Sequence, residues 1–487
     1  MTGGVIIAYV VLLVLVGLYS ARQVRTESDY LVAGRQLGPI VLGATLPATQ
    51  MSAGTAIGTV GYIALYGYQY NWFWVALWTG WLVSMLFVAP KMHEFGRTHG
   101  GMTIPDIVGA RFGRTLRFVV ALIIVIAFLL LFSAEYQGAA TVFNLVFGIS
   151  YIPAVLISAA VVGIYSLSGG LFSVARNDML QMVVFVVGYV AAAVYALHAV
   201  GGMSGLQHRL STVDPQLLHV LGNSHMPLGT LIGFSIGTGV TFVAYPLDAV
   251  KFYAASKRSV LLRALTIGIL LQVIIAFTLG IIGSAGRALQ PNTNSATADD
   301  IAPYVALHTM PPVLAGLLMA AVIGAVMAVS SSIIMIISAA ISHDIVPFVR
   351  HTPQPEKSRL RSERVVSGLV VLAGVALAVK PIGSVATIVL IVQQFMASTL
   401  AVVLIAALNW RRATVAGAGA SMTAGFVGVI GWYAAGDPGG LAPVFGGLPL
   451  AVIAMIVGSL LTGSAPAPTV VDTPTPATAG STGEAQA

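Results

Sequence analysis

The chain has 487 residues, of which 57% are hydrophobic and only 8% are charged. A soluble protein carries roughly 25% charged residues, so this composition excludes a soluble multidomain protein. The formal net charge of +7 suggests a nucleic-acid partner. However, the basic residues lie beside predicted membrane crossings, next to the anionic inner leaflet, so we expect a lipid bilayer around the chain and no nucleic acid. The absence of Cys excludes disulfides and thiolate metal sites.

Long apolar segments fill the chain from its first residues. Each is about the 17–25 residues that cross ~30 Å of hydrocarbon as a helix, and the longer ones indicate tilt or breaks. Strands are excluded because barrel segments are shorter and alternate in polarity. The thirteen predicted segments are 4–21, 38–66, 70–90, 115–146, 151–168, 179–200, 227–247, 259–284, 311–342, 364–379, 382–408, 413–434 and 443–462.

The positions of the basic residues predict the direction of each segment. Of the 23 Lys and Arg residues, 20 lie in or beside the first, third, fifth, seventh, ninth and eleventh gaps. Because Lys and Arg are retained on the cytoplasmic side, we expect the N-terminus outside and the C-terminus inside. Arg22 and Arg25 follow the first segment, and no basic residue precedes it. A signal peptide has the opposite order, so we expect a retained helix.

Two segments carry residues that interrupt helices, and they run in opposite directions. The second contains Pro47 and the sequence SAGT at 52–55, and the seventh is rich in glycine and ends at Pro246. Secondary transporters often repeat a unit in inverted topology, with an interrupted first helix at the substrate and ion sites. The alternative is that these small residues only allow close helix packing.

This pattern predicts an all-α membrane protein with about 13 transmembrane helices and a five-plus-five inverted-repeat core, as in the leucine transporter. The last 24 residues are rich in Ala, Pro, Thr and Gly and lack the apolar content needed for order. The predicted organisation is an extra N-terminal helix over 1–22, a first repeat over 23–200, a second repeat over 201–408, two C-terminal helices over 409–463 and a disordered cytoplasmic tail over 464–487.

Ionisable side chains inside the apolar segments are scarce. Glu135 lies in the middle of the fourth segment, where a charge costs about 2.5–3.5 kcal/mol. It is therefore either functional or a protonated carboxyl bonded to a neighbouring helix. Asp178 directly precedes the sixth segment and is either functional or a surface partner of Arg176. Asp248 and Lys251, near the inner end of the seventh segment, are interpreted as a solvated pair.

Two further groups of residues allow more than one interpretation. Gln393 and Gln394 lie among apolar residues of the eleventh segment. Because buried amides need hydrogen-bond partners, they bind either a solute or a neighbouring helix. Five aromatic residues cluster between the second and third segments and are interpreted as an interfacial belt. They are Tyr66, Tyr68, Tyr70, Trp72 and Trp74.

Five stretches carry a resemblance in the order in which they occur. They are DYLVAGRQLG at 29–38, ATQMSAGTAIG at 48–58, SGGLFSVARNDMLQ at 168–181, PLDAVKFYAASK at 246–257 and AVMAVSSSIIMIISAAISHDIV at 325–346. Together they resemble the sodium/solute symporters, the family of the sodium/proline and sodium/galactose transporters. The resemblance extends from about Ser28 to the end of the eleventh segment. It implies the same five-plus-five fold and the same orientation of the termini.

The resemblance implies a sodium site built from carbonyls of the first core helix and hydroxyls of the eighth. The two expected hydroxyl positions fall on Ala328 and Val329, whose side chains carry no oxygen for a hard cation. Ser330 follows at once, so a small shift in register would restore hydroxyl ligands. The candidate sodium-binding residues are Ala48, Met51, Ser52, Ala325, Ala328, Val329, Ser330 and Ser331.

The resemblance also implies roles for three polar residues. Gln50 takes a position that is acidic or an amide in the family, and Asp178 takes one that is thought to help sodium leave towards the cytoplasm. Glu135 stands where relatives often have a neutral Gln, so a proton carried by Glu135 is an alternative to sodium. The candidate substrate-binding residues are Gln50, Thr55, Gly237, Gln393 and Gln394.

We therefore predict a secondary transporter that imports a small organic solute by sodium symport across the cytoplasmic membrane. A carboxylate-bearing solute is favoured because helix N-termini at breaks attract anionic groups. The coupling ion is Na⁺, with H⁺ or uncoupled transport as the alternative, and no other metal or cofactor is expected. A solute-sensing membrane domain is a further alternative. An enzyme is not expected, because the His residues lie mostly in gaps and no GxxxxGK[ST] sequence is present. The sequence does not predict the oligomeric state.

Overall fold

The structure is a computed structural model that describes residues 2–350, 356–380, 385–438 and 441–463. The described residues form helices and a single isolated bridge between Leu37 and Ala255, with no strand. The predicted tail over 464–487 lies outside the described residues. The all-helical class predicted from the apolar segments is confirmed for the described part of the chain.

The helices of the first half are α1 (Thr2–Ala21), α2 (Glu27–Val32), α3 (Pro39–Ala48), the π-helical turn η2 (Gly54–Thr59), α4 (Val60–Tyr66), α5 (Trp72–Phe87), α6 (Ala89–His99), α7 (Ile104–Phe112), α8 (Arg114–Phe147), α9 (Tyr151–Ala199) and α10 (Gly202–Val213). Those of the second half are α11 (Leu228–Val243), α12 (Pro246–Ala254), α13 (Arg258–Leu289), α14 (Ile301–Thr309), α15 (Pro312–Ala339), η6 (Ala340–Ile345), α16 (Val346–Arg350), α17 (Glu356–Ala378), α18 (Val385–Met396), η7 (Ala397–Ala401), α19 (Val402–Asn409), α20 (Val415–Ala434) and α21 (Val444–Thr462).

Both predicted interruptions are confirmed. The second segment is helical up to Ala48, unwinds, and becomes helical again from Ala53 into η2 and α4. Pro47 lies in the last turn of α3, where its ring disfavours continuation of the helix. The seventh segment is split between α11 and α12, and Pro246 begins the second piece, a position at which its missing N–H costs nothing.

A third bend lies within α9, which joins the predicted segments 151–168 and 179–200. Gly170 there has φ 50° and ψ −150°, a conformation that residues with a Cβ rarely adopt. A Cβ at this position would also stand 2.5 Å from the main-chain oxygen of Tyr30. The two helices of α9 therefore meet at a glycine that both backbone conformation and packing require.

The number of membrane crossings is only partly tested. Within the described residues, nine helices are long and apolar enough to cross a membrane, or ten if the bent pair Gly54–Phe87 and Ala89–His99 is one span. The pieces Pro39–Ala48 and Tyr151–Ile164 are apolar but short. The predicted count of thirteen therefore stays a prediction.

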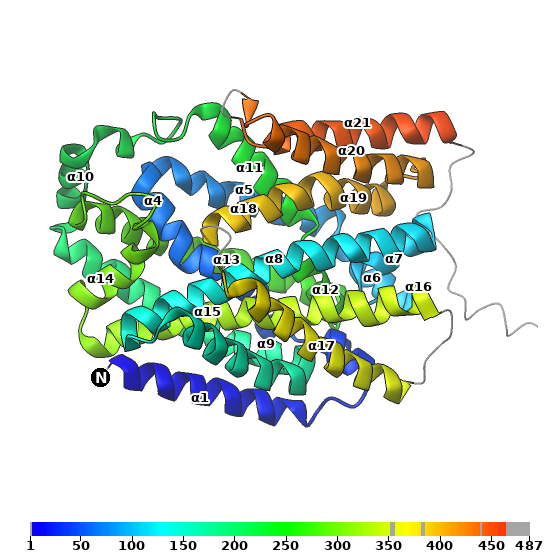
Figure 1. The fold of residues 1–487 in the computed structure, drawn as a ribbon, viewed down its shortest axis with the longest axis horizontal. Helices are drawn as coiled ribbons and strands as arrows, with labels where there is room; N and C mark the ends of the chain where they lie inside the picture. The colour runs from blue at the N-terminus through cyan, green and yellow to red at the C-terminus, as the bar shows by residue number, and fades with distance from the viewer. Residues whose placement is uncertain (1, 351–355, 381–384, 439–440, 464–487) are drawn as a thin grey trace, which may run out of the picture.

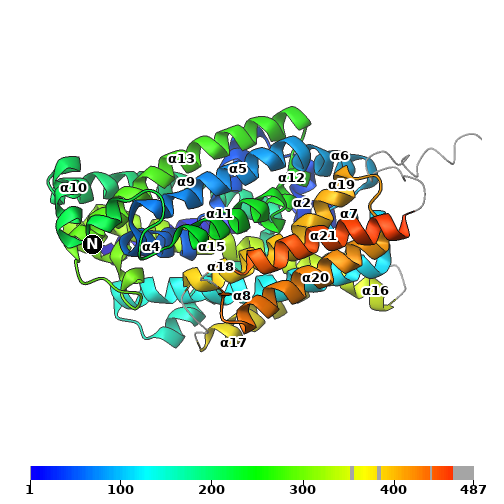
Figure 2. The ribbon, with the colours of Figure 1, turned by 90° about the horizontal axis from the view of Figure 1, so that it is seen from above.

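Helix α15 lies at the centre of the bundle. In the most apolar part of the span Pro312–Val349, 83% of residues are buried, against 28% for α1. Helix α15 contacts α1, α8 and α9, while α20 and α21 pack mainly on each other and on η7. Figure 2 shows α13 along one flank of the bundle, and Figure 1 shows α20 and α21 on the side opposite α1. The central position of α15 explains why it has no polar outer face.

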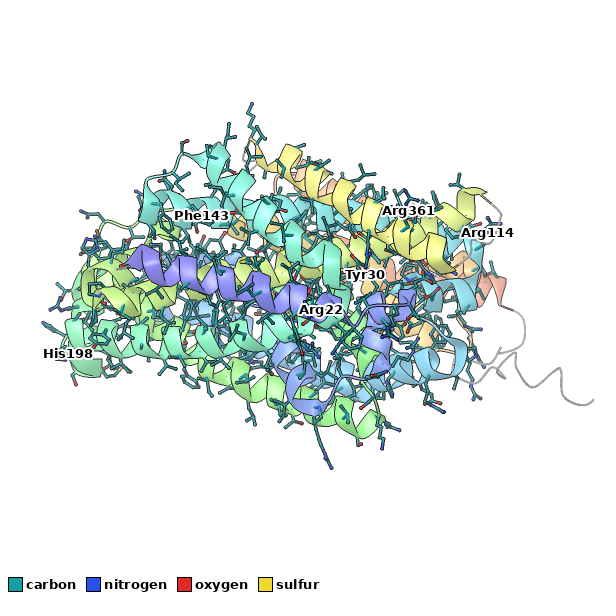
Figure 3. All side chains as sticks on the ribbon, turned by 90° about the horizontal axis from the view of Figure 1, so that it is seen from below. Arg22, Tyr30, Arg114, Phe143, His198 and Arg361 are labelled. Atoms are coloured by element: carbon teal, nitrogen blue, oxygen red, sulfur yellow. The ribbon has the colours of Figure 1, made fainter. Side chains whose placement is uncertain are left out.

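The long axis of the bundle separates the two ends of the described chain. Figure 1 shows α1 beginning at one end and α21 finishing at the other. In Figure 3, Arg114 and Arg361 lie towards the second of these ends, and Phe143 and His198 lie towards the first. The end that carries these two arginines is called the basic end below.

We expect Gly170→Ala to destabilise the fold, because it imposes strain of about 1–3 kcal/mol and a contact with Tyr30. Gly163→Ala in the same helix is the control, since the nearest atom to a Cβ there lies at 3.9 Å. Thermal unfolding of the purified variants in detergent measures the difference. Equal unfolding temperatures would contradict the requirement for glycine at the bend.

Candidate functional site

A small cavity of about 30 Å³ lies at the break between α3 and α4. Elements from both predicted repeats line it, namely the broken helix, α11 and α18, together with α8 and α15. None of the lining residues carries a formal charge. They are Thr49, Gln50, Ser52, Gly54, Thr55, Thr59, Tyr70, Phe73, Leu131, Phe242, Tyr245, Val329, Val389, Leu390 and Gln393.

The polar side of the cavity is held by hydrogen bonds within the chain. The Thr55 hydroxyl donates to the main-chain oxygen of Gln50 at 2.6 Å, across the break. On the opposite wall, the Thr238 hydroxyl donates to Oε1 of Gln393 at 3.2 Å. Thr241 donates to the main-chain oxygen of the same residue at 2.5 Å. Because Thr238 fixes the amide oxygen of Gln393, the amide NH₂ group is the end left to meet a solute.

The aromatic side of the cavity corrects one interpretation from the sequence. Tyr70 stacks against Phe234 with ring centroids 5.4 Å apart and lines the cavity. Trp74 is only 1% exposed. The interpretation as an interfacial belt is therefore wrong for these two residues. Trp72, which is 38% exposed, is compatible with it. Phe242 and Tyr245 reach the cavity from the second broken helix, and no sequence signal singled them out.

Glu135 is fully buried on α8 and binds the broken helix. Its Oε2 accepts a hydrogen bond from the main-chain N–H of Ala53 at 2.9 Å. Ala53 is the residue at which the helix resumes, so the carboxyl group supplies a partner to an N–H that the break leaves without one. Within the described residues, Oε1 of Glu135 has no hydrogen-bond partner. Both interpretations made from the sequence therefore remain open.

A second polar centre lies beside the cavity, and we call Asp178, Asp248 and Lys251 the charge triad. All three side chains are at most 1% exposed. Nζ of Lys251 lies 3.6 Å from Oδ2 of Asp178. The interpretation of Asp248 and Lys251 as a solvated pair is therefore wrong. The surface pairing of Asp178 is wrong too, because Arg176 donates to Ser20 and Gln23 instead.

Gln50 connects the cavity to the charge triad. Its Nε2 lies 2.9 Å from Oδ2 and 3.1 Å from Oδ1 of Asp248. The indole N–H of Trp81 donates to Oδ2 of the same carboxylate at 2.9 Å. The unwound part of the first broken helix is thus bound to the first turn of α12, the second piece of the other broken helix.

A family model described as the sodium:solute symporter family matches residues 30–425. The chain belongs to the sodium:solute symporter family. Its members are transporters and not enzymes. The sodium/pantothenate symporter of Escherichia coli (strain K12) is 28% identical over 480 residues, which are 96% of this chain and 98% of the relative. The sodium/proline symporter of the same organism is 26% identical over 469 residues, 94% and 92% of the two chains.

Solved structures agree with this assignment at the level of the fold. A Na⁺-coupled sialic acid symporter in a substrate-bound outward-open state matches with a TM-score of 0.80 and 19% identity, over 96% of this chain and 98% of the other. MhsT in complex with L-phenylalanine matches with a TM-score of 0.52 and 16% identity, over 86% and 98%. Both likenesses support the predicted leucine-transporter-like fold of this symporter.

The structure places the candidate sodium residues on the unwound part of the first broken helix and on α15. Ala328 offers only its main-chain oxygen, which accepts a hydrogen bond from the Ser331 hydroxyl at 2.9 Å. Val329 lines the cavity. The hydroxyls of Ser330 and Ser332 are buried, and within the described residues they have no hydrogen-bond partner. Helix α15 is continuous here. The assignment of sodium ligands in this symporter stays a prediction.

Two of the candidate substrate residues lie away from the cavity. Oε1 of Gln394 accepts a hydrogen bond from the main-chain N–H of Val444 at 3.0 Å. A Cβ at Gly237 would stand 3.3 Å from Cγ of Gln394 and 3.6 Å from Cβ of Val444. Both residues therefore hold α11 and α18 against α21. Gln50, Thr55 and Gln393 do line the cavity, and a role in binding solute stays a prediction for all five.

A network of charged residues near the basic end has no counterpart in the sequence predictions, and we call it the inner cluster. Arg117 on α8 places one guanidinium nitrogen 2.7 Å from both Asp106 and Asp344. His343 lies 3.2 Å from Asp106 and 3.2 Å from Glu27. Burial alone would raise the pKa of Asp106, but His343 and Arg117 hold it below its usual range.

The inner cluster joins four separate elements, namely α2, α7, α8 and η6. Asp106, His343 and Asp344 are close enough together to suggest a metal site. However, the guanidinium of Arg117 already lies between the two carboxylates, which makes a bound metal cation unnecessary for charge balance. The cluster is therefore best explained as a set of ion pairs that joins these four elements at the basic end.

We expect Arg117→Ala to loosen the basic end, because removing one partner leaves buried carboxylates uncompensated. The chain has no Cys, so Ala249→Cys provides a single probe at a buried position beside Asp344. Maleimide labelling of that probe should accelerate about tenfold or more, the effect of ~1.4 kcal/mol. Arg97→Ala is the control, because Arg97 makes an exposed ion pair with Glu94. Equal labelling rates would contradict a closing role for the inner cluster.

Proposed function

We propose that this symporter imports a small carboxylate-bearing organic solute together with sodium across the plasma membrane. This proposal rests on the cavity between the two broken helices, which is lined by polar, aromatic and aliphatic side chains without formal charge. Membership of the sodium:solute symporter family supports sodium as the coupling ion. One cation moving through ~100 mV supplies about 2.3 kcal/mol, or roughly 50-fold accumulation.

The chemistry of the cavity supports a carboxylate in particular. The first broken helix resumes at Ala53 beside the cavity. Such ends favour anionic groups, and the carboxyl group of Glu135 already binds the first N–H. The solutes named for three similar proteins, pantothenate, proline and sialic acid, all carry a carboxylate. Tyr70 and Phe242 provide apolar surface for the rest of the solute.

We propose the orientation that the distribution of Lys and Arg predicts, with the N-terminus outside and the C-terminus inside. The opposite positions of the start of α1 and the end of α21 support it (Figure 1). In this orientation the inner cluster closes the cytoplasmic end. Solute and sodium enter from outside, and disruption of the inner cluster accompanies their release.

We expect Gln393→Ala to raise the solute concentration for half-maximal uptake about fivefold, since a lost hydrogen bond is worth roughly 1 kcal/mol. Gln394→Ala is the matched control, because its amide oxygen binds Val444 and not the cavity. It should leave half-saturation unchanged and lower the unfolding temperature instead. Uptake of a transported carboxylate into proteoliposomes measures both. If Gln393→Ala and Gln394→Ala gave the same half-saturation value, the solute would not bind to Gln393.

Proton coupling through Glu135 is the second candidate, favoured by its burial and by the absence of hydroxyls at Ala328 and Val329. We expect a sodium gradient alone to drive uptake of labelled monocarboxylates, amino acids or sugars into proteoliposomes. Glu135→Gln should retain much of this uptake, because its amide oxygen still accepts from Ala53. Uptake that a pH gradient alone drives, and that Glu135→Gln loses, would show that the coupling ion is a proton and not sodium.

A further inference from the structure

The ammonium group of Lys251 is surrounded by oxygen atoms from three different groups. The main-chain oxygen of Thr45 accepts from Nζ at 2.5 Å, and the hydroxyl oxygen of Thr49 accepts at 2.8 Å. Oδ2 of Asp178 lies 3.6 Å away. A carbonyl, a hydroxyl and a carboxylate are also the oxygen types that bind hard cations in proteins. The shell around Nζ therefore has the chemistry of a small cation site.

The local structure explains why these oxygens are available. Thr45 lies in the last turn of α3, where the break weakens the helical bond, and its oxygen lies 3.4 Å from the main-chain N of Thr49. The C-terminal end of a helix also carries partial negative charge, which favours a cation. Asp178 comes from α9 and Lys251 from α12. Three elements thus converge on one ammonium group.

Lys251 is the one cationic member of the charge triad, and it offsets one of the two carboxylate charges. Asp178 and Asp248 are both fully buried, and the other side chains that bind the charge triad are neutral, namely Thr45, Thr49, Gln50 and Trp81. Oδ1 of Asp178 has no hydrogen-bond partner within the described residues. Removal of Lys251 would leave two carboxylates in a low-dielectric interior, where an unpaired charge is very costly.

We propose that Lys251 is a tethered cation, which occupies a position that a mobile sodium ion would otherwise take between α3, α9 and α12. The chain carries this positive charge permanently and does not release it to the cytoplasm. The symporter consequently moves one sodium ion fewer per solute than a variant without Lys251. This consequence for stoichiometry rests on the proposed sodium coupling, whereas the cation site itself does not.

The test compares wild type, Lys251→Met and the double variant Lys251→Met with Asp178→Asn. Unfolding temperatures of the purified proteins are measured without solute, in sodium chloride and in choline chloride. We expect Lys251→Met to show an added sodium-dependent rise of about 2 °C or more over wild type. The double variant should lose this added rise, since its carboxylate is gone. Lys91→Met, which removes an ammonium bound to Leu408 and Asn409, is the control.

A second measurement follows the charge moved per solute in proteoliposomes, where Lys251→Met should gain one positive charge relative to wild type. A sodium response equal to that of wild type, or one retained in the double variant, overturns the proposal. If the Lys251→Met protein does not accumulate in the membrane, restored accumulation of the double-variant protein supports charge compensation. Failure of both proteins to accumulate overturns the proposal. Failure of the proposed function is distinct, since it appears as wild-type uptake that sodium does not drive.

Discussion

The whole arrangement depends on the hydrogen bonding of unwound backbone inside a membrane protein. Away from water, each main-chain N–H and C=O needs a partner within the chain. Between Ala48 and Ala53 some of these partners are main-chain groups, such as the oxygen of Pro47 that accepts from the N–H of Gln50, and others are side chains. Glu135 accepts from the N–H of Ala53, and Thr55 donates to the oxygen of Gln50. The break is stable because residues on other helices, or across the break itself, replace the lost helical bonds.

Because the break is stabilised by side chains, it couples several parts of the molecule. Gln50 extends from the unwound segment to Asp248 on α12, and Thr45 and Thr49 bind Lys251 on the same helix. The unwound segment beside the cavity is thus in direct contact with the charge triad. Since α12 belongs to the second broken helix, these contacts join the two breaks.

Buried charges serve two different purposes in this fold. The inner cluster joins α2, α7, α8 and η6 through short ion pairs at the basic end. Such pairs contribute little net stability, but breaking one leaves an uncompensated charge, so they favour one closed arrangement. The charge triad lies beside the cavity and places the ammonium group of Lys251 beside buried carboxylates. The first joins helices at one end of the bundle, and the second joins the two broken helices beside the cavity.

The sequence alone determined the membrane class, both helix breaks and most helix positions, because hydrophobic length, proline and glycine act locally along the chain. It also identified Glu135, Gln393 and Gln394 as polar residues inside apolar segments. Only the tertiary structure decided which charges pair. Asp178 binds Lys251, 73 positions away along the chain, and not the adjacent Arg176. Neighbouring Gln393 and Gln394 face a cavity and a helix, respectively. Pairings of this kind arise from packing between distant helices, which no local pattern records.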